Sequence, residues 1–421
     1  MATDAEALSP PETGELSTSP DSGEPAAESA VTEAPPPRQA SVNAGSGVDP
    51  VGEYLDAIEK AETQGGAWST DLIDLYYGMG KALMDNGELD QARDAFHRAA
   101  MVARVNNGPY SLEQSDYLYG IAEIEFRVGN PEAATEALET IYRINAREYG
   151  EENPDLLPAV EKIYTWYADH LASDGLPIRS ADFQNLALLM ERIALLTEAK
   201  YGLGNLRTAL SYRALGQAHY RAIHFMVSSG QAPQSDLVLE TGEDSGPVAP
   251  DRVLVDHLMR GEQALRHSVE SWQANPDATA LEVAEALAQL GDWNLALDFG
   301  RAARQTYEQA WQVLSASDAV GFLAPEYLGT PTPLRFMNPA RDFVRNLDSP
   351  PDASSLQVSM TVTDDGRVRD VEVVNVPSSV PDEQLEQLKQ ELKLARFRPA
   401  VLEGEVQPVE GYVWKTALAP E

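Results

Sequence analysis

The fold of this 421-residue chain is decided by the stretch Gly87-Glu88-Leu89-Asp90-Gln91-Ala92, with Tyr76 and Gly80 before it and Phe96 and Ala99 after it. A glycine followed by acidic residues ends one helix and begins the next. The small side chains at Gly80, Ala92 and Ala99 allow two helices to approach closely, and the two aromatic rings fill the space beside them. The stretch therefore predicts two packed helices joined by a tight turn at Gly87.

The same frame occurs twice more in the chain. It surrounds Gly129, with Leu118, Ile121, Ala122, Ala134 and Leu138, and Gly291-Asp292-Trp293, with Ala284, Ala296 and Ala303. The unit resembles the tetratricopeptide repeat, a helix–turn–helix element of about 34 residues. The longer spacing of 42 residues from Gly87 to Gly129, and the joints Tyr149-Gly150-Glu151-Glu152-Asn153-Pro154-Asp155 and Tyr201-Gly202-Leu203-Gly204-Asn205, are similar to the repeats of kinesin light chains.

This resemblance implies a mainly α fold with a tetratricopeptide-type α-solenoid over residues 50–314. We expect a lead helix near 50–63 and helix pairs at 70–104, 111–149, 154–201, 205–273 and 277–314. A segment rich in Ser, Gly, Pro and acidic residues predicts a loop insertion near 227–250. Several such units must stack before a solenoid buries a continuous core.

Two further segments have the composition of unfolded chain. Residues 1–49 contain 7 Pro, 9 acidic residues and a single base, Arg38, which predicts a disordered acidic tail. Residues 315–355 contain Pro325, Pro331, Pro333, Pro339, Pro350 and Pro351. We interpret 315–355 as a Pro-rich linker.

From Leu356 the hydrophobic period changes from helical to alternating. Leu356, Val358, Met360 and Val362 predict a half-buried strand, and Asp364-Asp365-Gly366 predicts a hairpin turn. Val371 and Val373 continue a return strand in which Val368 is out of phase, so we expect a β-bulge. After Pro381, a helix face is formed by Leu385, Leu388, Leu392 and Ala395, and a last strand runs over Gln407 to Thr416.

The order of these elements, together with Ala395-Arg396-Phe397-Arg398-Pro399-Ala400 and Gly404 before Pro408-Val409, resembles the C-terminal domain of TonB-family proteins. The resemblance implies a small α+β domain over residues 356–418. We expect residues 352–421 to fold alone. Arg396, Arg398 and Lys415 are expected to form a local basic spot.

Composition excludes several classes of function. With 31 Lys and Arg against 67 Asp and Glu, the net charge of −36 disfavours nucleic acid and anionic lipid as partners. The absence of cysteine excludes disulfides and thiolate sites. The segment Gly78-Met79-Gly80-Lys81 lacks the spacing of a phosphate loop, and His219 and His224 do not share a helix face. We therefore expect no catalytic residues, no metal site and no cofactor.

The resemblance to tetratricopeptide repeats implies a binding groove lined by positions 2, 5, 9 and 12 of the first helix of each pair. In the first two units these positions hold Asp74, Tyr77, Lys81, Met84, Asp116, Tyr119, Glu123 and Phe126. The aromatic and methionine side chains would anchor a partner protein. The alternative is that Tyr77 and Phe126 only pack against neighbouring helices.

The resemblance to TonB implies a second binding surface at the edge of the last strand, where an extended segment of a partner adds a strand. Pro408 donates no hydrogen bond, so the expected surface is Val409, Gly411, Tyr412, Val413, Trp414 and Lys415. The alternative is a domain that serves only as a folded end-piece or pairs with itself.

Taken together, these patterns predict a non-catalytic adaptor that binds proteins. The TonB resemblance implies a periplasmic location, a partner such as an outer-membrane receptor or another envelope protein, and a link to TonB-type transport. The alternative is a cytoplasmic scaffold, favoured because no basic-then-apolar leader precedes the acidic segment. No run of about 18 apolar residues predicts a membrane span. The sequence leaves the oligomeric state and any energy-transducing role open.

Overall fold

The computed structural model describes residues 49–171, 179–229, 250–334, 356–375 and 382–416. The expected acidic tail lies outside these residues except for Asp49, and most of the expected loop near 227–250 also lies outside them.

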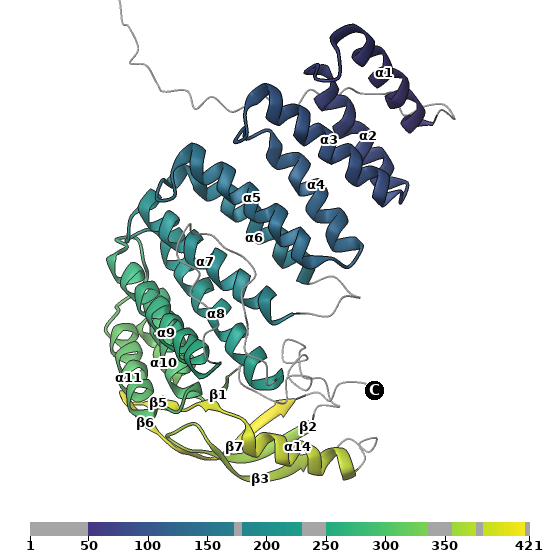
Figure 1. Cartoon of the computed structure of the whole chain (residues 1–421). Coiled ribbons are helices and arrows are strands. Elements are labelled where there is room, and N and C mark those ends of the chain that lie inside the picture. Colours follow the sequence, from purple (N-terminus) through teal and green to yellow (C-terminus); the bar gives the residue numbers. More distant parts are fainter. Residues whose placement is uncertain (1–48, 172–178, 230–249, 335–355, 376–381, 417–421) are drawn as a thin grey trace, which may run out of the picture. The chain divides into compact units, whose positions relative to one another are not determined.

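The helical region consists of consecutive antiparallel helices (Figure 1): α1 (Pro50–Gly65), α2 (Asp71–Asp85), α3 (Leu89–Asn107), α4 (Gln114–Arg127), α5 (Pro131–Tyr149), α6 (Leu157–Leu171), α7 (Ser180–Tyr201), α8 (Leu206–Ser229), α9 (Pro250–Ala274), α10 (Ala280–Ala296) and α11 (Gly300–Ser315).

Glycines spaced at the repeat length end the helices. Gly108 and Gly150 have φ angles of 92° and 97°, and their N–H groups donate to the carbonyls of Arg104 and Ala146. A residue with a Cβ rarely adopts this left-handed conformation, so glycine fixes where each helix stops. Within a pair, Gly87 makes the equivalent turn with a φ of 81°.

In the first and last pairs, neighbouring helices pack closely where a glycine faces an aromatic ring. A Cβ added at Gly80 would lie 2.8 Å from the ring of Phe96, and one at Gly120 would lie 2.7 Å from the same ring. In the last pair, a Cβ at Gly291 would lie 2.4 Å from Tyr307. Phe96 and Tyr307 are both fully buried. The sequence prediction of small residues beside large rings is therefore confirmed at both ends of the solenoid.

The first part of the expected linker is folded. After α11 the chain forms a 3₁₀ turn (Gly321–Leu323), α12 (Ala324–Leu328) and strand β1 (Thr332–Pro333). Ala324, Leu328 and Leu334 are buried in the same core as α10 and α11. The interpretation of 315–355 as a linker is thus wrong over 321–334, because its apolar residues cover the last helix pair; residues 335–355 lie outside the described part of the chain.

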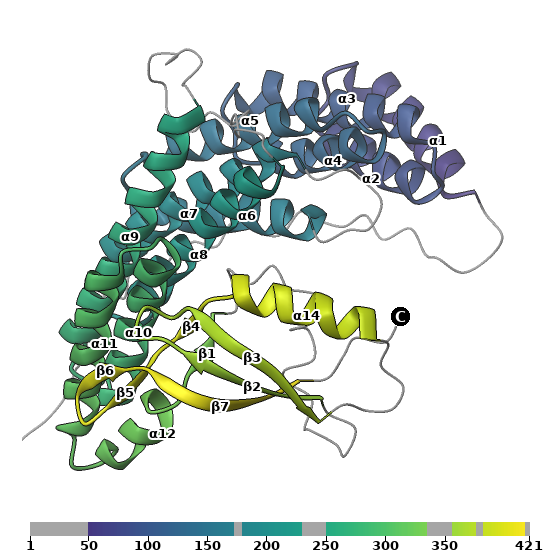
Figure 2. The ribbon, with the colours of Figure 1, turned by 90° about the horizontal axis from the view of Figure 1, so that it is seen from below.

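The C-terminal region contains a three-stranded antiparallel sheet in the order β3-β2-β7, formed by β2 (Leu356–Val362), β3 (Val368–Asn375) and β7 (Val409–Thr416). Helix α14 (Asp382–Leu394) lies along this sheet (Figure 2), and its Leu388 and Leu392 are buried with Phe397 and Trp414. The predicted hairpin turn closes with Gly366 at a φ of 71°. The predicted bulge in β3 is also confirmed, with Asp370 at a φ of 52°.

The remaining strands lie between the sheet and the last helix pair, and Phe397 of β4 still belongs to the core of the sheet. Strand β4 (Phe397–Arg398) pairs with β1, and β5 (Ala400–Leu402) pairs with β6 (Glu405–Gln407). Val401 and Val406 are buried in one cluster with Trp293 and Tyr307 of the last helix pair. The expectation that residues 352–421 fold alone is therefore not supported, because part of their apolar surface is covered only by the solenoid.

A buried ion pair joins β4 to α10 where the C-terminal strands pack on the last helix pair; we call this contact the junction. Arg398 donates from Nε and Nη2 to the two carboxylate oxygens of Asp292, at 2.8 and 2.6 Å. The hydroxyl of Tyr307 donates to the same carboxylate at 2.8 Å. The Arg398 and Asp292 side chains are 10% and 9% exposed, so a single bidentate pair satisfies both charges away from water.

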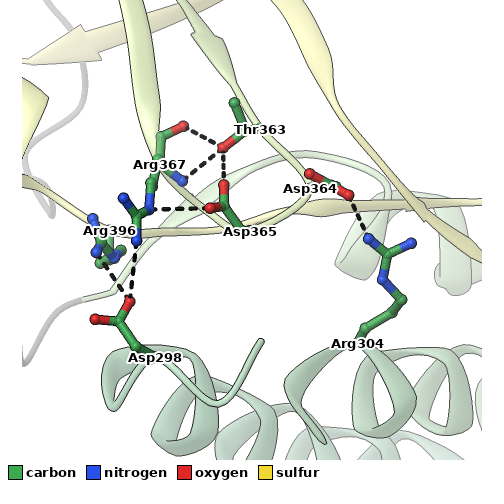
Figure 3. A network of polar contacts seen from close by, with 7 residues as sticks. All are labelled: Asp298, Arg304, Thr363, Asp364, Asp365, Arg367 and Arg396. Carbon is green, nitrogen blue, oxygen red and sulfur yellow. Dashed lines mark hydrogen bonds and ion pairs between the residues drawn. The ribbon is translucent and has the colours of Figure 1, made fainter. Parts of the chain in front are cut away.

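Exposed ion pairs surround the junction (Figure 3). The guanidinium groups of Arg396 and Arg367 lie 3.1 and 3.7 Å from Asp298, in the turn between α10 and α11. Arg304 of α11 pairs with Asp364 in the β2–β3 turn. The expected basic spot is therefore absent, because acidic residues of the solenoid pair with Arg396 and Arg398. Of the three basic residues expected there, Lys415 is exposed.

We predict that Asp292→Ala lowers the free energy of unfolding by about 3–5 kcal/mol, because it leaves the Arg398 charge buried and unpaired. The double variant Asp292→Leu, Arg398→Met should recover most of this loss, since apolar residues replace the whole pair. Urea unfolding followed by circular dichroism measures both.

The matched control is Glu262→Ala, which removes the exposed ion pair of Arg266 with Glu262 within α9. It should cost no more than about 0.5 kcal/mol. An Asp292→Ala variant no less stable than this control would contradict the structural role of the junction.

Candidate functional site

A cavity of about 500 Å³ lies along the first helices of three successive pairs, α2, α4 and α6. Its lining consists of five aromatic or methionine residues, five charged residues, a glycine and a threonine. The lining residues are Tyr77, Lys81, Met84, Phe96, Asp116, Tyr119, Gly120, Glu123, Lys162, Thr165, Trp166 and Asp169. We call this surface the groove. Apolar walls with a few placed charges suit a side chain of a partner segment.

Six of the eight predicted groove residues line this cavity: Tyr77, Lys81, Met84, Asp116, Tyr119 and Glu123. Asp74 is exposed on α2 outside the lining. Phe126 lies behind the wall, where its ring centroid is 5.6 Å from Trp166 and 4.4 Å from His170. The packing alternative therefore describes Phe126, whereas Tyr77 both packs against Tyr117 at 5.3 Å and lines the cavity.

The sequence analysis missed the third wall of the groove, on α6. Lys162, Trp166 and Asp169 follow Tyr119, Glu123 and Phe126 by 43 residues, and α4 and α6 begin 43 residues apart, at Gln114 and Leu157. The same positions 5, 9 and 12 therefore line the groove in the third unit. The signal was present, but the third unit lacks a Gly-Asp turn, so its register was not assigned from the sequence.

The two groove lysines lie over tyrosine rings. Lys162 Nζ is 4.2 Å from the ring centroid of Tyr119 and 3.3 Å from Asp116 Oδ1. Lys81 Nζ is 5.6 Å from the ring centroid of Tyr77. Burial raises the pKa of both tyrosine hydroxyls, and the Asp116 carboxylate raises it further, so both remain protonated donors at neutral pH.

Glu123 is a groove acid with two ion-pair partners, His170 and Arg127. Its carboxylate lies 2.8 Å from His170 Nε2 and 2.6 Å from Arg127 Nε. The hydrogen bond to His170, with that to Arg127, lowers the pKa of Glu123 to about 2 against the opposing effect of burial. Glu123 is therefore ionised across the physiological range, and it links α4 to α6.

A pair of buried histidines lies outside the groove, between α7, α8 and α9. The Nδ1 atoms of His219 and His257 are 2.8 Å apart, and His257 Nε2 is 2.6 Å from Gln184 Oε1. Both rings are almost fully buried. Burial lowers the pKa of His219 to about 3 and that of His257 to about 4. The pair is neutral and structural, because an N–H···N bond forms only while one of the facing nitrogens lacks a proton.

The predicted sheet-edge residues lie on β7, which pairs with β2 alone among the described strands. Val413 and Lys415 are exposed, Val409 and Tyr412 are half-buried, and Trp414 is buried in the core of the sheet. Gly411 has a φ of 65° where the register with β2 shifts. Trp414 is therefore a packing residue, and the exposed side of the edge carries Val413 and Lys415.

Neither a membrane span nor a metal site is found in the described ranges. No helix there is long and apolar enough to cross a membrane. Likewise, no three or more His, Asp or Glu side chains in those ranges are grouped as metal ligands would be.

Comparison with known proteins identifies the repeats. A family model described as tetratricopeptide repeat matches residues 71–155, which comprise α2 to α5 and the turn that follows. These two helix pairs are tetratricopeptide repeats, as the sequence frame predicted, and they carry the first two walls of the groove. No curated protein matches the chain.

Two solved structures illustrate the similarity to other repeat proteins. One contains the nearly identical TPR-like repeats of a candidate kinesin light chain from Podosopora anserina, with 12% identity and a TM-score of 0.33, covering 59% of this chain and 98% of that chain. The other is BtubC (BKLC) from P. vanneervenii, with 12% identity and a TM-score of 0.30, covering 63% and 90%.

We predict that stability falls as the pH decreases from 6.5 to about 5. The unfolded chain protonates His219 and His257 near the ordinary pKa of about 6.5, whereas the folded chain keeps both neutral. Each histidine therefore costs up to about 1.4 kcal/mol per pH unit below 6.5, and the stability is fully present above it. Urea unfolding at a series of pH values measures this slope.

The double variant His219→Leu, His257→Leu should have a flatter slope between pH 6.5 and 5. The exposed His97→Gln variant serves as the control and should keep the original slope. Equal slopes in the double variant and the unmodified chain would contradict the assignment.

Proposed function

We propose that this chain is a non-catalytic adaptor whose groove binds a short segment of a partner protein. The observation that carries the proposal is the cavity shared by α2, α4 and α6, since three repeats place aromatic and methionine side chains on one surface. Tyr77 and Met84 of α2, Tyr119 of α4 and Trp166 of α6 all line this cavity. Aromatic residues in such pockets often supply most of the binding energy.

The segment that fits has a bulky apolar side chain flanked by polar residues. The apolar side chain would contact Met84, Tyr119 and Trp166, while the charged residues at the rim fix its orientation. No residues of the groove form an arrangement of nucleophile and base, so binding without chemistry is the function that this geometry supports best.

We predict that Thr165→Arg blocks the groove without loss of fold. Thr165 is an exposed lining residue whose hydroxyl donates to the carbonyl of Glu161 at 2.9 Å, so the longer side chain fills the cavity rather than the core. Peptides selected from a displayed random library on the unmodified chain should bind this variant at least about tenfold more weakly, as expected when an anchor pocket is lost. Fluorescence polarisation measures the affinity.

Thr140→Arg is the matched control, because Thr140 on α5 makes the same bond to the carbonyl of Glu136 at 2.9 Å and does not line the groove. Both variants should keep the circular dichroism of the unmodified chain. Equal peptide affinities for the two variants would refute the groove as the binding surface.

The second candidate function is strand addition at β7, favoured by its position at an edge of the β3-β2-β7 sheet. An edge strand presents unpaired N–H and C=O groups to an extended segment. The sequence motifs that resemble TonB-family domains imply a partner in the cell envelope, such as an outer-membrane receptor, and a periplasmic location linked to transport; we propose these on that resemblance alone. The alternative is a cytoplasmic scaffold in which β7 pairs with a second copy. Fractionation of the native cells would distinguish the compartments.

We predict that library peptides selected on the Thr165→Arg chain, whose groove is closed, raise amide-exchange protection along Val409 to Lys415. Val413→Pro should weaken their binding roughly 2- to 13-fold if its N–H faces outward, because one ladder hydrogen bond contributes about 0.5–1.5 kcal/mol. Protection confined to the solenoid would show that β7 is not a docking edge.

A further inference from the structure

His170 on α6 has a hydrogen-bond acceptor at each ring nitrogen. Nδ1 lies 2.6 Å from the carbonyl oxygen of Trp166, and Nε2 lies 2.8 Å from Glu123 Oε2. A carbonyl and an ionised carboxylate only accept, so both nitrogens must donate. A neutral imidazole carries one N–H and would leave one of these short contacts without a proton. The geometry is therefore satisfied only by the doubly protonated ring.

The same ring supports the wall of the groove. It is stacked on the indole of Trp166, with centroids 3.8 Å apart and planes inclined by 22°, and Phe126 meets it edge-on at 4.4 Å. Trp166 lines the cavity, whereas His170 lies behind it with its side chain 16% exposed. A cation over an aromatic face adds attraction to the stack.

We propose that His170 is a positioning residue of the groove: as an imidazolium it ties α6 to Glu123 on α4, holds Trp166 in the groove wall, and makes partner affinity fall as the pH rises. The effect on affinity rests on the proposed function of the groove. The charge state of the ring and the placement of Trp166 do not, and they can be measured on the free chain.

The acidic groups around the ring favour this state. The Glu123 carboxylate contacts the ring from α4, and Asp169 precedes it on α6; Arg127 of α4 pairs with the same Glu123 carboxylate. Burial alone would lower the pKa of His170, but the bonds to Glu123 and to the Trp166 carbonyl, with the charges of Glu123 and Asp169, raise it above the ordinary value. The stabilisation from protonated His170 is therefore fully present below about 6.5 and is lost as the pH rises through the raised pKa.

The first test is a ¹H–¹⁵N spectrum of the full chain with labelled histidine rings, assigned with His170→Gln. We expect two ring N–H groups for His170 at pH 6.5 and a titration midpoint above that of free histidine, about 6.5. A single N–H, or a midpoint at or below that value, would overturn the proposal.

The second test follows the indole with acrylamide as the probe. Quenching of Trp166, taken as the difference between the chain and its Trp166→Phe variant, should increase from pH 6.5 to 8.5. His170→Gln keeps a donor but cannot titrate, so it should abolish this change, and His97→Gln should leave it intact. Quenching of Trp166 that does not change with pH in the unmodified chain would contradict a positioning role. Loss of the pH-dependent change in the His97→Gln control would contradict it too.

The last test separates this inference from the proposed function. A peptide that Thr165→Arg excludes should bind the unmodified chain about tenfold more weakly at pH 8.5 than at 6.5, the effect of losing one charge-assisted hydrogen bond. Equal affinity at both pH values would overturn the inference while the groove function stands. A peptide unaffected by Thr165→Arg would instead contradict the groove function, and the two measurements on the free chain would then decide the role of His170.

Discussion

The bidentate pair between Arg398 and Asp292 is the constraint on which the C-terminal half of the structure depends. Removing two charges from water is costly, and the cost is offset only while the partners face each other and Tyr307 completes the carboxylate's bonds. Asp292 belongs to the last helix pair and Arg398 to β4, so the strand region reaches its native packing only against the solenoid. We interpret this region as the cap of the last repeat, which a repeat array needs where stacking ends.

The groove and the cap occupy different repeats. The groove is formed by the first three helix pairs, whereas the cap packs on α10, α11 and α12. Because each repeat contacts mainly its neighbours, a change in one of these regions should affect the other only weakly. The groove and the exposed edge of β7 are therefore formed by different parts of the chain.

The sequence predicted most of the secondary structure because the determinants are local. Gly87, Gly108 and Gly150 stop helices by their own backbone conformation, and Gly366 turns the hairpin. Six groove residues followed from the repeat register. The third wall at Trp166 was missed because its unit lacks the marker turn. The Asp292–Arg398 pair could not be predicted, since the two residues are 106 positions apart and Arg398 reads locally as an exposed base. His170 was equally hidden, because its role depends on Glu123 on another helix.

Hydrogen exchange in increasing urea, read by mass spectrometry on the full chain, tests the central claim that the β5–β6 hairpin and the last repeat fold as one unit. We predict that amides of β5 and β6 open at the same free energy as those of α10 and α11, because they share one core. If the β5 and β6 amides exchange at low urea while α10 and α11 remain protected, the strand region is a separate domain and the cap interpretation is wrong.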